Sequence, residues 1–220
     1  MSVHLADEGL SYFSVPKCGC TSLKLMFFRL LHGLTFEQAS EQGHPATREA
    51  GHIHEVFPSQ PFGVTRAQSG EGWTRLAVVR DPVSRIASCY ANKVFQNNGL
   101  LWPGIREAVE AAGLSLEPDF DTFVTDLDAY RAASPDIAHH SEPLSHFLGT
   151  DPAYFTRIFP LNDVNGFVDF LGACLGRDVP PLSREQQSVS WSVLSEVDPD
   201  TTRRIETRFA EDIALFGDHF

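Results

Sequence analysis

The stretch that most constrains the fold is residues 12–24, where an apolar-rich run ends abruptly at Pro16 and Lys17. A short loop of small and hydroxyl-bearing residues follows, and it contains a single glycine, Gly19. An amphipathic helix is predicted directly after this loop. A strand, a tight loop and a helix in this order present successive backbone N–H groups at a helix N-terminus, which favours anion binding. Lys17 adds a mobile positive charge to the same loop.

Apolar periodicity predicts the remaining elements. Residues 10–15 and 76–79 are typical of buried strands, and residues 155–161 are a third candidate. Helices are predicted at residues 21–32, 105–112, 119–132, 164–175 and 200–216, with another after Pro82. Asp81 suits the N-cap of that helix, and Gly33 and Gly176 suit helix ends. Strands that alternate with helices predict an α/β, P-loop-like three-layer fold, with a central, mainly parallel sheet flanked by helices.

The periodicity also predicts which helix faces are buried. The helix at residues 21–32 should bury five apolar side chains: Leu23, Met26, Phe27, Leu30 and Leu31. The helix after Pro82 should bury Val83, Ile86, Ala87, Tyr90 and Val94, and expose Arg85, Ser88 and Asn92. Arg85 is expected to pair with an acid on that surface. Residues 35–68, 97–104, 134–149 and 180–190 are predicted to be loops.

Size and charge limit the classes of function. A chain of 220 residues fits one domain spanning residues 1–220. Its net charge of −12 argues against a general nucleic-acid or acidic-membrane partner, because both need a basic surface. No signal peptide or membrane span is expected from the hydropathy pattern. The four cysteines lack zinc-site spacing, which favours reduced thiols and a cytoplasmic location.

A second segment complements the first loop. Arg80, Asp81 and Pro82 end the predicted strand at residues 76–79, and Ser88 follows two helical turns later. Ligands of parallel sheets bind beyond the carboxyl ends of strands, so the two segments are expected to lie close together. The first loop is not a Walker A motif, since Lys17 precedes the glycine. Arg80 supplies a bidentate fork for phosphate. Together the segments predict a ligand with two separated anionic groups.

The two segments resemble known motifs. Residues 15–24 (VPKCGCTSLK) resemble the 5′-phosphosulfate-binding loop of sulfotransferases that use 3′-phosphoadenosine-5′-phosphosulfate (PAPS). Residues 79–90 (VRDPVSRIASCY) resemble their 3′-phosphate-binding motif. The Pro-Lys-x-x-Cys-Thr form, with Lys93 soon after Tyr90, is most similar to the carbohydrate sulfotransferases of family 2, the chondroitin and HNK-1 type. Weaker similarity continues at residues 120–124 and 212–217, so the resemblance covers most of the chain.

The resemblance implies a role for each matching residue. Lys17 would contact the sulfuryl group and the oxygen that bridges it to the leaving phosphate. The N–H groups of Cys18, Gly19, Cys20, Thr21 and Ser22, with the Thr21 and Ser22 hydroxyls, would hold the 5′-phosphate. Arg80 and Ser88 would hold the 3′-phosphate, and Arg184 is a weaker candidate for nucleotide contact. No metal is expected, since a lysine can replace magnesium at a sulfuryl group. The acceptor would be a hydroxyl of a carbohydrate or small metabolite.

The base for the acceptor hydroxyl is expected between the two motifs. Residues 51–55 (GHIHE) resemble the place where heparan 2-O-type sulfotransferases carry a catalytic histidine after a glycine. That match favours His52, because histidine titrates near working pH. His54 and Glu55 are the alternatives, Glu55 either as the base or as a residue that orients a histidine. His139 and His140 are later candidates.

Two other functional classes are compatible with parts of this pattern. A P-loop nucleotide kinase or NTPase would need magnesium and an acidic residue at a strand end, where this chain has Arg80. A non-catalytic nucleotide-binding relative would bind the ligand without transfer. Lys17 and His52 argue against that second alternative.

Overall fold

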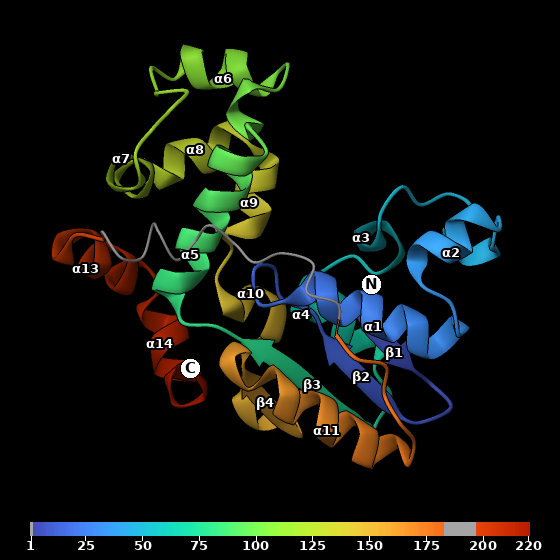
Figure 1. The fold of residues 1–220 in the computed structure, drawn as a ribbon. Coiled ribbons are helices and arrows are strands. Elements are labelled where there is room, and N and C mark those ends of the chain that lie inside the picture. The colour runs from blue at the N-terminus through green and yellow to red at the C-terminus, as the bar shows by residue number, and fades with distance from the viewer. Residues whose placement is uncertain (1, 183–196) are drawn as a thin grey trace. The chain divides into compact units, whose positions relative to one another are not determined.

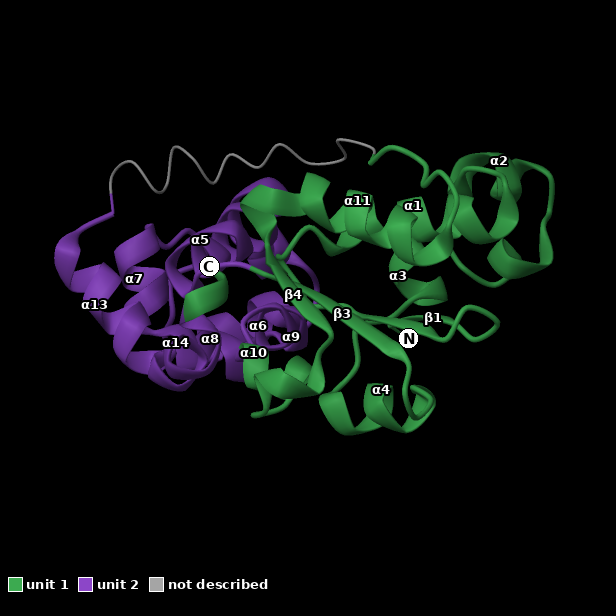
Figure 2. Cartoon of the chain, turned by 90° about the horizontal axis from the view of Figure 1, so that it is seen from below, with its two compact units in different colours: residues 1–79, 144–186, 218–220 green, residues 80–143, 187–217 purple. Residues whose placement is uncertain are grey.

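The computed structural model describes residues 2–182 and 197–220, which form two compact units (Figure 2). Unit 1 comprises residues 1–79, 144–186 and 218–220, and unit 2 comprises residues 80–143 and 187–217. The chain leaves unit 1 after the strand β3 (Thr74–Val79) and returns to it at the helix α10 (Leu144–Leu148). Most of the loop predicted at residues 180–190, with Arg184, lies outside the described residues.

Unit 1 is built on a four-stranded sheet with the order β1-β2-β3-β4 (Figure 1). β1 (Val3–Leu5) runs antiparallel to β2 (Leu10–Phe13), whereas β2, β3 and β4 (Arg157–Pro160) are parallel neighbours. The α/β class with a mainly parallel sheet is therefore confirmed. β1 was not predicted, because three residues carry no measurable period and the strand depends on its pairing with β2.

Helices cover both faces of this sheet. α1 (Cys20–His32) and α11 (Val164–Leu175) lie on one face, and α4 (Phe62–Gln68) and α10 lie on the other (Figure 2). Tyr12 packs between the two helices of the first face, with its ring 5.4 Å from that of Phe27 and 5.6 Å from that of Phe167. As predicted, left-handed glycines end α1 at Gly33 and α11 at Gly176.

The predicted loop at residues 35–68 is partly helical. It contains α2 (Phe36–Glu41), a 3-10 turn (Pro45–Thr47), α3 (Ile53–Val56) and α4. Two further 3-10 turns (Pro152–Tyr154 and Leu161–Asp163) flank β4. α2 and α3 both pack on α1, and this changes the buried surface of α1. Leu31, predicted to be buried, is 42% exposed, whereas Lys24 and Phe28 are fully buried.

Unit 2 is helical, and two helices that were predicted as continuous are broken. Its elements are α5 (Pro82–Tyr90), a π-helical segment (Ala91–Gln96), a 3-10 turn (Gly99–Leu101), α6 (Ile105–Ala111), α7 (Phe120–Thr125), α8 (Leu127–Ala133), α9 (Pro135–His140), α13 (Pro199–Arg208) and α14 (Ala210–Phe216). Non-helical dihedrals at Asp126 and Phe209 cause the two breaks. α9 and α10 lie where residues 134–149 were predicted to be a loop. The last 3-10 turn is Gly217–His219.

The exposed face predicted for α5 is wrong. Arg85, Ser88 and Asn92 are all buried, because α7 and α13 pack on α5 and the chain continues into the π-helical segment. The Arg85 guanidinium donates to the Glu142 carbonyl and lies 5.5 Å from the centre of the Phe209 ring. Arg85 is therefore a packed residue of the unit 2 interior, as expected of a structural residue, and it does not form the predicted surface ion pair.

Candidate functional site

The segment after β2 begins with a strained turn. The Cys18 N–H donates to the Val15 carbonyl at 3.4 Å, and Lys17 between them has a φ of +65°. Proline at the second position and a positive φ at the third are typical of a type II turn, whose third position usually holds glycine. A lysine in this conformation costs about 1–2 kcal/mol relative to the ordinary helical region. Backbone strain of this kind concentrates at functional sites.

The N-terminus of α1 follows this turn and has a glycine at its N-cap position. Gly19, with φ 71° and ψ 14°, has no side chain that could accept a hydrogen bond from the first turn. No acidic residue occupies that turn. The first N–H groups of a helix have no partner inside the helix, and its N-terminus carries a partial positive charge. The start of α1 is therefore suited to an anionic ligand.

Gly19 is also held by close packing. A Cβ atom at this position would lie 2.7 Å from Cδ1 of Leu161, the residue that follows β4. Cδ1 is the end of a flexible side chain that can move, so Gly19→Ala should lower the free energy of unfolding by about 1–3 kcal/mol, mostly from the positive φ. Urea denaturation measures this loss. Gly33→Ala is the matched control, since Gly33 has a φ of +70° with no atom within 4 Å of its Cβ position. Equal losses in the two variants would contradict the packing argument.

The second segment follows β3 and begins unit 2. Asp81 caps α5 by accepting a hydrogen bond from the Ser84 N–H at 2.9 Å, and Pro82 is the first helical residue, as predicted. Arg80 directly precedes this cap and is partly buried. Ser88 lies two turns along α5 and is 5% exposed. Because β2 and β3 are parallel neighbours, the segments that contain Lys17 and Arg80 follow strands that end at the same sheet edge.

His52 and Glu55 form a pair on α3, in unit 1. His52 precedes the helix, and its Nε2 lies 3.2 Å from Oε1 of Glu55. The other oxygen of Glu55 accepts a hydrogen bond from the Gly51 N–H at 2.5 Å. The His52 side chain is 61% exposed, so its ring is open to solvent. The Glu55 carboxylate therefore contacts both the His52 ring and the backbone of Gly51.

His54 has different surroundings, although the two histidine rings are only 5.9 Å apart. Nε2 of His54 lies 2.9 Å from the Thr21 hydroxyl, and Nδ1 lies 3.1 Å from the Lys24 ammonium nitrogen. Thr21 and Lys24 both belong to α1, so His54 connects α3 to the first turns of that helix through these two contacts. Lys24 was not predicted to be a site residue. Its position beside Phe27 and Phe28 on the helical wheel is the sequence signal that would have indicated its burial.

The later histidine candidates lie in unit 2. Nδ1 of His140 is 3.0 Å from a carboxylate oxygen of Asp136, which also pairs with Lys93 at 3.0 Å. Burial lowers the pKa of His140 against the effect of Asp136. Burial alone would raise the pKa of Asp136, but His140 and Lys93 hold it far below its usual value. His140 is therefore engaged with Asp136, which also pairs with Lys93, within unit 2.

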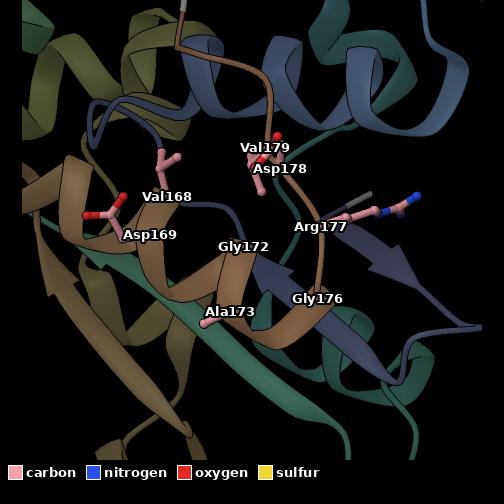
Figure 3. A pocket seen from close by; sticks show the side chains of 8 residues that line it. All are labelled: Val168, Asp169, Gly172, Ala173, Gly176, Arg177, Asp178 and Val179. Carbon is pink, nitrogen blue, oxygen red and sulfur yellow. The ribbon is translucent and has the colours of Figure 1, made fainter.

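Unit 1 also has a groove, which is formed by residues other than the candidate site residues described above. It has a volume of about 540 Å³ and is lined by α11 and the segment after it: Val168, Asp169, Gly172, Ala173, Gly176, Arg177, Asp178 and Val179 (Figure 3). Arg177 also pairs with Glu8 at 2.8 Å. None of the predicted site residues lines this groove.

The fold and these two segments define an α/β protein in which a lysine-bearing turn at a strand end leads into a helix N-terminus suited to an anion. A family model described as "Sulfotransferase family" matches residues 4–218, which is nearly the whole chain. The chain therefore belongs to the sulfotransferase family, of the family 2 type, and the resemblance found in the sequence is confirmed. Searches of curated proteins and of solved structures gave no significant match.

Two further findings concern the residues that the structure describes. None of their helices has the length and apolar character needed to cross a membrane. No group of three or more His, Cys, Asp or Glu side chains among them is placed to hold a metal ion.

Proposed function

We propose that this sulfotransferase moves a sulfuryl group from PAPS to a hydroxyl of a carbohydrate or small metabolite and releases 3′,5′-adenosine bisphosphate. The observation that carries the proposal is Lys17, held at a φ of +65° two residues before Gly19, the N-cap of α1. Family membership over residues 4–218 supports it. Because that match spans both units, we also propose that residues 1–220 form one sulfotransferase domain.

The proposed chemistry is an in-line displacement at sulfur. The acceptor oxygen forms a bond to sulfur while the bond from sulfur to the bridging phosphate oxygen breaks, and the acceptor proton passes to His52. By analogy with phosphoryl transfer, the transition state is loose, and the protein contributes mainly positioning and charge stabilisation. Lys17 neutralises the charge that develops on the bridging oxygen. Glu55 orients His52 for this proton transfer.

The donor would be held at its two anionic ends. The N–H groups of Gly19, Cys20, Thr21 and Ser22, with the Thr21 and Ser22 hydroxyls, bind the 5′-phosphate. The Cys18 N–H contributes less than the sequence suggested, since it closes the turn to Val15. Arg80 and the Ser88 hydroxyl bind the 3′-phosphate, Arg80 through its bidentate fork. Independence of metal and a reducing, cytoplasmic compartment stay predictions.

Ligand-induced stabilisation tests the donor assignment. At a hundred times its dissociation constant, 3′,5′-adenosine bisphosphate should stabilise the chain by about 2.7 kcal/mol, whereas ATP with magnesium should not.

Arg80→Gln should weaken bisphosphate binding about 10- to 100-fold, because a charge-assisted bidentate contact is lost. Arg106→Gln is the matched control in unit 2, since Arg106 pairs with Glu110 on the surface of α6. Titration calorimetry measures both affinities.

Each outcome separates the alternatives. Stabilisation by ATP with magnesium and not by the bisphosphate would favour a nucleotide kinase or NTPase and overturn the proposal. Bisphosphate binding without transfer to any acceptor would indicate a non-catalytic relative. A screen of carbohydrate and small hydroxyl acceptors with labelled PAPS addresses transfer and identifies the acceptor class at the same time.

A further inference from the structure

Five polar side chains around the first turns of α1 form a connected hydrogen-bond network in unit 1: Ser14, Thr21, Lys24, His54 and Ser59. The Lys24 ammonium contacts Nδ1 of His54 at 3.1 Å and the Ser59 hydroxyl at 3.0 Å. Nε2 of His54 contacts the Thr21 hydroxyl at 2.9 Å. The Ser59 hydroxyl also contacts that of Ser14, the residue after β2, at 2.9 Å. These contacts are partly buried, and hydrogen-bond networks of this kind fix the orientation of their members.

Lys24 determines the direction of these hydrogen bonds. An ammonium group donates hydrogen bonds and accepts none, so the contacts of Lys24 make Nδ1 of His54 and the Ser59 oxygen acceptors. A neutral imidazole that accepts at Nδ1 carries its proton on Nε2. That N–H then donates to the Thr21 oxygen. Burial lowers the pKa of Lys24, while the side chain of Cys20 one turn earlier acts in the opposite direction.

The consequence reaches the proposed ligand through Thr21. A hydroxyl has one hydrogen to donate and two lone pairs that accept. With one lone pair occupied by His54, the Thr21 hydrogen is free to point toward another acceptor. Thr21 lies in the first turn of α1, beside the N–H groups assigned to the 5′-phosphate. The hydroxyl is therefore oriented as a donor in advance of ligand binding, which reduces the cost of ordering it.

We propose that Lys24 and His54 are positioning residues that hold the Thr21 hydroxyl as a hydrogen-bond donor to the anionic ligand of the loop. The inference rests on the proposed function, because it names how that site is prepared for its donor. It gives His54 a role distinct from that of the base, since both of its ring nitrogens are engaged with α1. His52, which is open to solvent, retains the role of base.

The tautomer of His54 tests the direction of the network without any ligand. Nitrogen-15 NMR of histidine-labelled protein should show Nδ1 of His54 unprotonated and Nε2 protonated at neutral pH. The signal is assigned by its absence from His54→Gln. Lys24→Met, which removes the donor to Nδ1 and keeps the length of the side chain, should shift this tautomer equilibrium toward Nδ1–H. A proton on Nδ1 in the unsubstituted protein would overturn the proposal.

Binding of 3′,5′-adenosine bisphosphate tests the consequence. His54→Gln keeps a donor near the position of Nε2, whereas His54→Asn is too short to reach Thr21. His54→Asn should weaken binding about tenfold and His54→Gln less than about threefold. In a Thr21→Val background, His54→Asn should have no further effect. Equal losses in the Asn and Gln variants, or additive losses with Thr21→Val, would overturn the proposal. If the unsubstituted protein bound no bisphosphate, the proposed function would fail, and the tautomer would still decide the direction of the network.

Discussion

Lys17→Ala and Lys17→Gly are both expected to reduce sulfuryl transfer about 10²- to 10³-fold, while the glycine variant is the more stable of the two. The loss of activity follows because each substitution removes the charge that is proposed to stabilise the departing phosphate oxygen. Affinity for 3′,5′-adenosine bisphosphate should change only a few-fold, since this product lacks the sulfuryl group that Lys17 is proposed to contact. Single-turnover rates with labelled PAPS and calorimetric titration measure the two quantities separately.

The stability difference between these two variants comes from the backbone. Alanine at a φ of +65° keeps the strain that lysine bears, whereas glycine has no Cβ atom and relieves it. Lys17→Gly should therefore exceed Lys17→Ala by about 1 kcal/mol in the free energy of unfolding. Asn98, with a φ of 47°, supplies the matched pair of variants in unit 2, where Asn98→Gly should exceed Asn98→Ala while transfer is retained. Intact transfer in Lys17→Ala would show that the assigned mechanism is wrong.

His52→Ala is the second substitution with a large expected effect. Loss of a general base typically costs about 10²- to 10⁴-fold in turnover. The KM for PAPS should change little, since His52 is proposed to act on the acceptor. Steady-state rates, with PAPS and the acceptor varied in turn, make the measurement.

Two further variants control for position on α3. Glu55→Gln removes the carboxylate that contacts the His52 ring and should cost less, about 10- to 100-fold in turnover. His54→Gln should leave turnover closest to that of the unsubstituted protein. If His54→Gln abolished turnover and His52→Ala did not, the base would be His54, and the exposed pair of His52 and Glu55 would have no catalytic role.

Much of unit 1 could be predicted because its elements have strong local signals. β2, β3 and β4 appear as apolar stretches, and α1 and α11 have clear helical periodicity ended by Gly33 and Gly176. The N-cap at Asp81 in unit 2 was also predictable, because aspartate followed by proline is a typical signal for the start of a helix. These features depend on neighbouring residues alone, so no tertiary information was needed to find them.

The predictions that were wrong concern helix breaks and buried faces, which depend on tertiary packing. Apolar periodicity continues through Asp126 and Phe209, so the sequence does not reveal the breaks between α7 and α8 or between α13 and α14. The buried state of Arg85 depends on Phe209 and the Glu142 carbonyl, which lie far along the chain. α9 is an exception, because Ser134 and Pro135 form the usual N-cap signal and were overlooked.

The residue types of the candidate site could be predicted from the sequence, whereas its backbone conformation could not. The sequence places lysine, glycine and hydroxyl residues in order, but nothing in it indicates that Lys17 has a positive φ. The hydrogen bonds from His54 to Thr21 and Lys24 likewise require α3 to fold back onto α1. His52 and His54 are separated by one residue, and the sequence does not distinguish them. In the structure, the His52 side chain is exposed to solvent, whereas both ring nitrogens of His54 contact α1.

The turn at Pro16 and Lys17 has a consequence for how such chains diverge. Glycine at its third position would relieve the backbone strain, so the lysine there points to selection for its side chain. A lineage released from that selection should drift to glycine at this position early, before its core changes. The identity of this one residue would then distinguish relatives that still transfer a group from those that have kept only the scaffold.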